Sequence, residues 1–471
     1  MACEPVYEAG DPDNFVKSRQ LTTPLMLGKI CRLWRHIVLD SPRLWNVIFL
    51  DLRRKPQVYK TQLELLESWL SRSGDLLLSI YLDELEGGPA GWVENPPVEV
   101  FDLLAGYSHR WLHVSTFLVG PCWEGLEKLP LPSLTTLAVR PPGNAHSATG
   151  LTEAIWRISY APSLRSAYFV MFDKVGMELP THQLTEITMK SCTWQDCLSL
   201  LASAPNVVHC TLLDLRSHFS DDHHAVIALP YLSSLTVGCQ VGVLVLRSIM
   251  TPALSQMQAI WSTNLYPESF ASVKTFLSRS SCSLRELSFD VPHFWKPSEK
   301  ALIVTLADME NVEKLELICE RGGTLEPVFY HLNPARPQYT PQYLPPGRVV
   351  LPNLRCFRYR GPMTFEIHYL IKMIDMRYRM SIDGEKDMQL EPVRREGNHN
   401  RIARPESFNI EILKMKRHYS YTTLCDYADT LLRLMEEHDG ITFSFLDEMD
   451  DNISLQSLIA MDSGRAVVVF T

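Results

Sequence analysis

A short apolar pattern recurs through the middle of the chain and constrains the fold more than any other sequence feature. In each copy, apolar residues occupy the first, fourth and sixth positions, as in Leu134-Thr-Thr-Leu137-Ala-Val139. Clear copies also begin at Leu232, Leu284, Val312 and Leu354, and weaker copies begin at Leu164, Leu184, Val207 and Leu254. Eight intervals separate position 134 from position 354, so one unit has about 27.5 residues on average. Repeated units of uneven length therefore build the middle of the chain.

This period and pattern resemble those of leucine-rich repeats, which have roughly 20–29 residues per unit. The alternating apolar residues predict a short strand in each copy, and residues 194–204, 269–277 and 298–308 predict helices between copies. We therefore expect an α/β fold, a leucine-rich-repeat-like solenoid in which a parallel sheet carries helices on its convex side. Because the spacing is irregular and 46% of the residues are hydrophobic, chance recurrence is the alternative.

Residues between the apolar positions are expected to point outward and to form one continuous binding surface along the concave sheet. The middle outward positions are Ala138, Tyr168, Thr188, Thr211, Thr236, Gln258, Ser288, Glu316 and Arg358. Charged residues gather in the last units, where a partner recognised through charge would bind. The expected surface for a protein substrate comprises Tyr168, Gln258, Arg285, Glu286, Glu313, Glu316, Arg355 and Arg358. The alternative is a solvated face that binds nothing.

Residues 24–38 have the apolar spacing of one amphipathic helix. Its apolar stripe consists of Leu27, Ile30, Cys31, Trp34, Ile37 and Val38. Thr23 can cap the start of the helix, Pro24 suits its first turn, and Ser41-Pro42 ends it. Spacing alone favours an ordinary amphipathic helix, because such stripes are common.

The residues themselves resemble the second half of the F-box motif, in the version common in large fungal families. That version has the core V-C-x-x-W-R-x-I-A-x-x-x-P-x-L-W, and here Ile30-Cys31, Trp34-Arg35, Ile37 and Pro42-x-Leu44-Trp45 follow in the same order. Segments at residues 66–80 and 107–111 also resemble that family, so the resemblance covers about residues 24–120. Family members begin the motif with an L-P-x-E-[IL]-L-x-x-I-F helix, which nothing before Leu25 matches.

In that family the F-box binds a Skp-type adaptor of a cullin ubiquitin ligase. The adaptor-binding residues that the resemblance implies are Leu27, Ile30, Trp34, Ile37, Pro42, Leu44 and Trp45. It predicts a substrate-recognition subunit that holds a protein substrate on its repeats and performs no chemistry itself. The unmatched first helix supports an alternative, an adaptor-independent leucine-rich-repeat interaction protein with a decayed F-box.

Five segments follow from these patterns. They are a polar N-terminal segment 1–23, a partial F-box-like all-α region 24–60, a helical linker with the first strands 61–130, irregular repeats 131–361, and a degenerate repeat with a C-terminal cap 362–471. The last segment is assigned from expected helices at 366–379 and 422–437 and alternating strands near Phe408 and Phe443.

Composition narrows the function classes. The net charge of −9 disfavours nucleic acid, and no apolar run is long enough to span a membrane. Eleven scattered cysteines without a C-x-x-C pair indicate reduced thiols and a cytoplasmic or nuclear protein. No catalytic motif or cofactor-binding motif occurs, so neither an enzyme nor a cofactor is expected. Asp221-Asp222-His223-His224 has metal-ligand residue types, but no second ligand pair has the right spacing, so a solvated turn is the favoured interpretation and no metal site is predicted.

Overall fold

The structure is a computed structural model that describes residues 24–51, 56–83, 98–117, 129–140, 156–170, 177–216, 225–238, 242–261, 267–291, 296–319, 325–335, 343–344, 348–386, 402–415, 420–438 and 440–447. The chain divides into two compact units, unit 1 (Met1–Asp222) and unit 2 (His223–Thr471). The candidate metal ligands at 221–224 lie outside the described residues.

Unit 1 contains a parallel sheet in the order β1-β2-β3-β4-β6-β8-β9. Its strands are β1 (Val47–Asp51), β2 (Leu78–Asp83), β3 (Trp111–Phe117), β4 (Thr136–Arg140), β6 (Ser166–Val170), β8 (Glu186–Lys190) and β9 (His209–Leu213). Its helices are α2 (Pro24–Leu27), α3 (Arg32–Leu39), η1 (Pro42–Leu44), α4 (Pro56–Arg72), α6 (Val98–Ala105), η2 (Ser108–Arg110), η4 (Thr181–Gln183) and α8 (Trp194–Ser203). Strands β5 (Trp156–Arg157) and β7 (Met177–Glu178) form a small second sheet.

Unit 2 repeats this architecture with a parallel sheet in the order β11-β13-β14-β15-β16-β17-β18. Its strands are β11 (Ser234–Gly238), β13 (Gln256–Ile260), β14 (Glu286–Val291), β15 (Lys314–Cys319), β16 (Cys356–Pro362), β17 (Ser407–Met415) and β18 (Ile441–Asp447). Its helices are α9 (Gly242–Ser248), α10 (Pro267–Ser280), α11 (Lys296–Ala307), α12 (Glu326–Leu332), α13 (Ile367–Lys386) and α14 (Ser420–Glu437). Strands β10 (Ile227–Ala228) and β12 (Ile249–Met250) pair separately.

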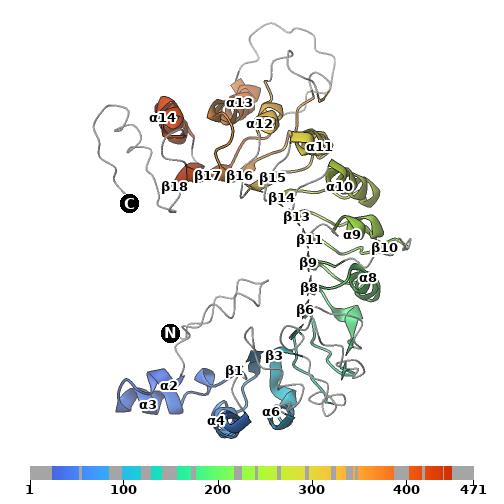
Figure 1. The fold of residues 1–471 in the computed structure, drawn as a ribbon, viewed down its shortest axis with the longest axis vertical. Coiled ribbons are helices and arrows are strands. Elements are labelled where there is room, and N and C mark those ends of the chain that lie inside the picture. The colour runs from blue at the N-terminus through green and yellow to red at the C-terminus, as the bar shows by residue number, and fades with distance from the viewer. Residues whose placement is uncertain are drawn as a thin grey trace. The chain divides into compact units, whose positions relative to one another are not determined.

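Helices α10 to α14 lie on one side of the unit 2 sheet, and each contacts its neighbour in the series (Figure 1). The opposite face of these strands carries no helix in the part of unit 2 that the structure describes. The expected α/β fold with a parallel sheet and helices on one face is therefore confirmed.

The apolar pattern accounts for this architecture. Each of the nine copies contains a strand that starts two residues after the first apolar position, for example β4 after Leu134 and β16 after Leu354. The side chains at all nine first positions are buried, with Leu284 the most accessible at 4%. Burying an aliphatic side chain contributes about 1.5–3 kcal/mol to the stability of the fold. The apolar pattern recurs in each unit because each unit covers the apolar edge of its neighbour.

Strand register stacks equivalent residues. Leu315 at a fourth position pairs with Leu287 on one side and with Phe357 on the other. At the strand entrances, the amides of Glu313 and Lys314 both donate to the carbonyl oxygen of Arg285, at 2.8 and 2.9 Å. In both units, one carbonyl oxygen accepts from two successive amides of the following strand entrance. Neighbouring strands therefore enter the sheet in the same register.

The sheet begins earlier than the sequence predicts. Residues 24–60 were expected to be all helical, but β1 occupies Val47–Asp51 and pairs in parallel with β2. Trp45 and Ile48 are 3% and 2% exposed and occupy the first and fourth positions of a further copy, Trp45-x-x-Ile48-x-Leu50. A search for leucine at the first position misses this copy because an indole fills the place.

The expected single helix over residues 24–38 is also interrupted. Helix α2 ends at Leu27, residues 28–30 form a turn, and α3 starts at Arg32. The amide of Lys29 donates to the carbonyl oxygen of Met26, and Arg35 Nε donates to the carbonyl oxygen of Gly28 at 3.0 Å. Gly28 marks the break, because glycine is the weakest helix former here apart from proline.

The C-terminal part of the chain contains the expected helices and strands. Helices α13 and α14 and strands β17 and β18 lie where helices and alternating strands were expected. Phe408 pairs with Phe357 on one side and with Ile441 on the other, so these strands extend the repeat sheet. Residues 387–401 and 448–471 of the expected cap lie outside the described residues.

The buried Arg377 stabilises the long insertion between β15 and β16. Arg377 of α13 is fully buried, and its guanidinium donates to the carbonyl oxygens of Leu332, Val350 and Leu351 at 2.9, 2.7 and 3.0 Å. Burial lowers the pKa of Arg377 to about 9, which leaves it protonated at neutral pH. Arg377 therefore joins the end of α12 to the residues that lead into β16.

Candidate protein-interaction surfaces

The apolar face of α3 and the preceding turn points away from the protein. Ile30, Leu33, Trp34 and Ile37 are 62%, 67%, 44% and 49% exposed. The spacing of Leu33, Trp34 and Ile37 places these three on one face of α3, and Ile30 precedes them in the turn. Leu25 and Met26 of α2 are exposed as well. Exposed apolar patches of this kind commonly mark interaction sites.

A different set of side chains attaches α3 to unit 1. Val38 is 2% exposed, and its carbonyl oxygen accepts a hydrogen bond from Trp45 Nε1 at 2.7 Å. The Trp45 ring packs edge-on against Trp69 of α4, with ring centroids 4.8 Å apart. Trp69 Nε1 in turn donates to the carbonyl oxygen of Val47 at 3.1 Å. This contact holds α3 beside β1 while its apolar face stays uncovered.

The predicted adaptor-binding residues therefore separate into three groups. Ile30, Trp34, Ile37 and Pro42 are exposed, and Leu27 and Leu44 are half-buried. Trp45 is in the core and is not available to a partner in this structure. Sequence reasoning missed Leu25, Met26 and Leu33. For Leu33 the available signal was its spacing of four residues from Ile37, which places both on one face of the helix.

The segment around α3 also carries exposed cations. Lys29, Arg32, Arg35 and Arg43 are exposed, and Asp40 is the one carboxylate between residues 24 and 45. No carboxylate in the described part of the chain forms an ion pair with Lys29, Arg32 or Arg43. Within α3, Arg32 and Arg35 lie on the side of the helix away from Leu33, Trp34 and Ile37, because successive residues are about 100° apart around the helix axis.

The middle outward row of unit 1 is uncharged. Register places Ala138 beside Tyr168, Tyr168 beside Thr188, and Thr188 beside Thr211. Tyr168 and Thr188 are only 8% and 5% exposed. Tyr168 thus holds the predicted position in the row but presents little surface to a substrate.

The corresponding row of unit 2 contains Thr236, Gln258, Ser288, Glu316 and Arg358 in consecutive strands. Arg358 Nη1 lies 3.1 Å from Glu316 Oε1, and Arg358 Nη2 lies 3.8 Å from Glu411 Oε2 on β17. Ser288 Oγ donates to Glu316 Oε2 at 3.0 Å. The charges that the sequence places on this face are thus paired across strands.

Further pairs surround this row. Lys314 Nζ lies 3.2 Å from Glu286 Oε2, and Gln256 Nε2 donates to Glu286 Oε1 at 3.1 Å. Arg355 Nη1 lies 2.8 Å from Glu406 Oε1, and this pairing raises the pKa of Arg355. Arg285 and Glu313 occupy the equivalent places before β14 and β15. Six of the eight predicted substrate-surface residues thus lie within this one charged region: Arg285, Glu286, Glu313, Glu316, Arg355 and Arg358.

The two carboxylates that pair with Arg358 are less accessible than its guanidinium group. The side chains of Glu316 and Glu411 are 18% and 20% exposed, whereas that of Arg358 is 45% exposed. A partner that binds this face would therefore contact the Arg358 guanidinium group, whose charge the less exposed carboxylates already balance. Exposed pairs of this kind contribute at most about 1 kcal/mol each.

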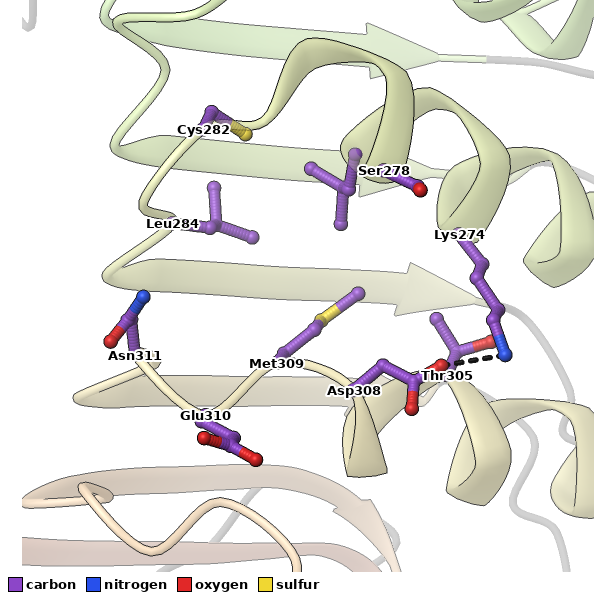
Figure 2. A pocket seen from close by; sticks show the side chains of 10 residues that line it. Lys274, Ser278, Cys282, Leu284, Thr305, Asp308, Met309, Glu310 and Asn311 are labelled. Atoms are coloured by element: carbon purple, nitrogen blue, oxygen red, sulfur yellow. Dashed lines mark ion pairs between the residues drawn. The ribbon is translucent and has the colours of Figure 1, made fainter.

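A hollow of about 320 Å³ lies where α10 and α11 lead into the following strands (Figure 2). Leu284 and Met309 line it, and Lys274 and Asp308 face one another at one end (Figure 2). Lys274 Nζ and Arg348 Nη2 lie 2.6 and 2.8 Å from the two oxygens of Asp308. Burial alone would raise the pKa of Asp308, but the hydrogen bonds and charges of these two cations lower it. The cluster joins three segments of unit 2.

Cys282 also lines this hollow, and burial raises the pKa of its thiol. A protonated thiol is a poor nucleophile. In the described part of the chain, no three histidine, cysteine, aspartate or glutamate side chains gather as metal ligands would. Nor does any described helix combine the length and apolar composition needed to cross a bilayer.

No model of a known protein family matches this chain, and no curated protein matches its sequence.

Proposed function

We propose that this protein is a substrate-recognition subunit of a Skp-cullin ubiquitin ligase. In this proposal the exposed face of α2 and α3 binds the Skp-type adaptor, and the open sheet faces of the repeats bind a protein substrate. The protein performs no chemistry itself and acts in the cytoplasm or nucleus. It delivers its substrate to the ubiquitin-conjugation machinery that the cullin carries.

The observation that carries the proposal is the uncovered apolar face of α3. Three large apolar side chains on one face of α3, and Ile30 in the preceding turn, are between 44% and 67% exposed, although the adjoining β1 has a well-packed core contact. Leaving them in water forgoes roughly 1.5–3 kcal/mol per side chain, so a partner that covers them has a strong driving force. The F-box resemblance of the same residues supports a Skp-type adaptor as that partner.

The test is co-expression of the full chain with a Skp-type adaptor, followed by size-exclusion chromatography and measurement of the dissociation constant. Combined Ile30→Ala and Leu33→Ala substitution should weaken binding at least about tenfold, as loss of central apolar anchors does. Tyr160→Ala, at an exposed residue of the same unit, is the matched control and should have no effect. The proposal fails if the wild-type chain does not associate, or if the double variant binds equally well.

A second candidate is an adaptor-independent interaction protein with a decayed F-box. The position of Trp45 favours this second candidate. Trp45 is buried at the first apolar position of a repeat copy, so its role in the fold requires no contact with an adaptor. Under this reading, a protein partner binds the sheet faces and removal of residues 24–39 leaves its affinity unchanged. Loss of that partner together with the helices would argue for the ligase subunit instead.

A further inference from the structure

We infer that a hollow on the open sheet face of unit 2 binds an extended, uncharged segment of the protein substrate through the main-chain amides of that segment. This inference rests on the part of the proposed function that assigns substrate binding to the sheet faces. It adds the place on the sheet and the chemistry that is recognised there. The hollow has a volume of about 190 Å³ and lies over β11, β13, β14 and β15.

Short side chains create this hollow. In the middle outward row, Gln258 pairs with Thr236 on one side and with Ser288 on the other. Threonine and serine are short, so the Gln258 side chain stands between two low positions. Glu316, paired with Arg358, bounds the hollow on the β15 side. In the part of unit 2 that the structure describes, no helix covers this face of the strands (Figure 1), so the hollow is open to a partner.

The charged side chains beside the hollow already have partners. Their cross-strand pairs form an ion-pair lattice that consists of Glu286–Lys314, Glu316–Arg358 and Glu406–Arg355. Gln256 Nε2 donates to the second oxygen of Glu286 at 3.1 Å. Ser288 Oγ donates to the second oxygen of Glu316 at 3.0 Å. A charged ligand would have to displace one of these partners, so the hollow does not favour a charged group.

The neutral polar side chains of the hollow remain available. Ser234, Thr236 and Gln258 are half-buried, and no residue in the described part of the chain forms a hydrogen bond with their side chains. The Gln258 carboxamide has N–H donors and an accepting oxygen, and each peptide unit likewise has one donor and one acceptor. Gln258 can therefore donate to and accept from one extended chain. An apolar ligand over Gln258 would leave these polar atoms without partners, which weakens binding.

The dimensions of the hollow also suit an extended segment. Neighbouring strands are about 4.8 Å apart, so the four strands span roughly 14 Å, which is the length of about four residues of an extended chain. An α-helix is about 10–12 Å wide with its side chains and would rest on the rim. An extended segment therefore fits this hollow better than a helix.

The experiment selects a phage-displayed library of random decapeptides on the full chain and measures the dissociation constants of the selected peptides by fluorescence polarisation. Gln258→Leu removes the carboxamide at similar size and should weaken binding about tenfold. Thr236→Val, in the hollow, should weaken it about threefold. The matched control is Thr275→Val on the exposed side of α10, which should bind like the wild type. Thermal unfolding checks that all three variants fold.

A second measurement tests main-chain recognition without changing the protein. Methylation of one peptide nitrogen at a time removes a single N–H donor from the strongest selected peptide. At one or two positions we expect it to weaken binding to the wild type about tenfold and to have much less effect on Gln258→Leu. Replacing charged side chains of the peptide by alanine should have little effect.

The outcomes separate this inference from the proposed function. The inference is wrong if no peptide binds, or if Gln258→Leu binds every selected peptide like the wild type. It is also wrong if binding depends on charged peptide side chains and is lost in Arg358→Ala. If the chain binds a Skp-type adaptor but no peptide, only this inference fails. Peptide binding that depends on Gln258, in a chain that binds no adaptor, supports the inference and overturns the ligase proposal.

Discussion

Helix α3 and strand β1 are neighbours in the chain, yet they use their apolar residues in opposite ways. Trp34 and Ile37 of α3 are 44% and 49% exposed, while Trp45 and Ile48 before and in β1 are at most 3% exposed. Both segments show apolar spacing that suits their secondary structure. The difference teaches that such spacing identifies a face that must be covered, but not the molecule that covers it.

The same distinction holds between inward and outward residues of the repeat sheets. Inward positions are alike in both units, as at Leu137 in β4 and Leu315 in β15, which are both fully buried. Outward positions differ, since the middle row is uncharged in unit 1 and contains the Glu316–Arg358 pair in unit 2. Inward residues therefore build the fold, and outward residues are available for function.

The largest expected effect compares the two tryptophans. Trp45→Ala should lower the free energy of unfolding by about 3–5 kcal/mol, because it removes a buried indole, its hydrogen bond to Val38 and its contact with Trp69. Trp34→Ala should change it by less than about 0.5 kcal/mol. Urea unfolding of the two variants measures both values. Equal losses of unfolding free energy in the two variants would contradict the burial of Trp45 and the exposure of Trp34.

An intermediate effect compares adjacent residues of β15. Leu315→Ala should cost about 2–5 kcal/mol, because it leaves a cavity between Leu287 and Phe357. At the neighbouring outward position, a double-mutant cycle of Glu316→Gln and Arg358→Ala should give a coupling energy below about 1 kcal/mol that falls further with salt. A coupling of several kcal/mol would mean that the ion-pair lattice is part of the core.

The smallest effect concerns acid stability. The pKa of Asp308 is lowered in the folded protein, so its carboxylate adds stability above the unfolded pKa of about 3.9, and this is lost as pH falls through the folded pKa. Lys274 and Arg348 are more than a third exposed, which limits the contribution to less than about 1 kcal/mol. Unfolding of wild type and Asp308→Asn between pH 5 and about pH 2 should therefore differ slightly at the upper end and converge at the lower end. An unchanged difference across this range would contradict the assignment.

Much of the fold was predictable because the repeat couples sequence directly to burial. The first apolar position of each copy locates the following strand to the residue, and Leu134 and Leu354 illustrate this at either end of the series. The copy at Trp45 was missed because its aromatic residue does not match a leucine template. The break at Gly28 was missed because the apolar stripe continues across it.

The candidate sites were only partly predictable. The sequence identifies Arg358 and Glu316 as outward residues, but their pairing depends on two strands 42 residues apart lying side by side. Likewise, Trp45 and Trp34 both match the F-box resemblance, and only the contact between Trp45 and Trp69 separates them.

The sequence by itself determined the repeated strand units, the parallel sheet and the inward or outward position of most residues, because alternation along a strand is a local property. Only the tertiary structure decided which charges neutralise one another and which apolar face stays open. Those outcomes depend on distances between segments far apart in the chain, and the spacing of residues within one segment contains no information about them.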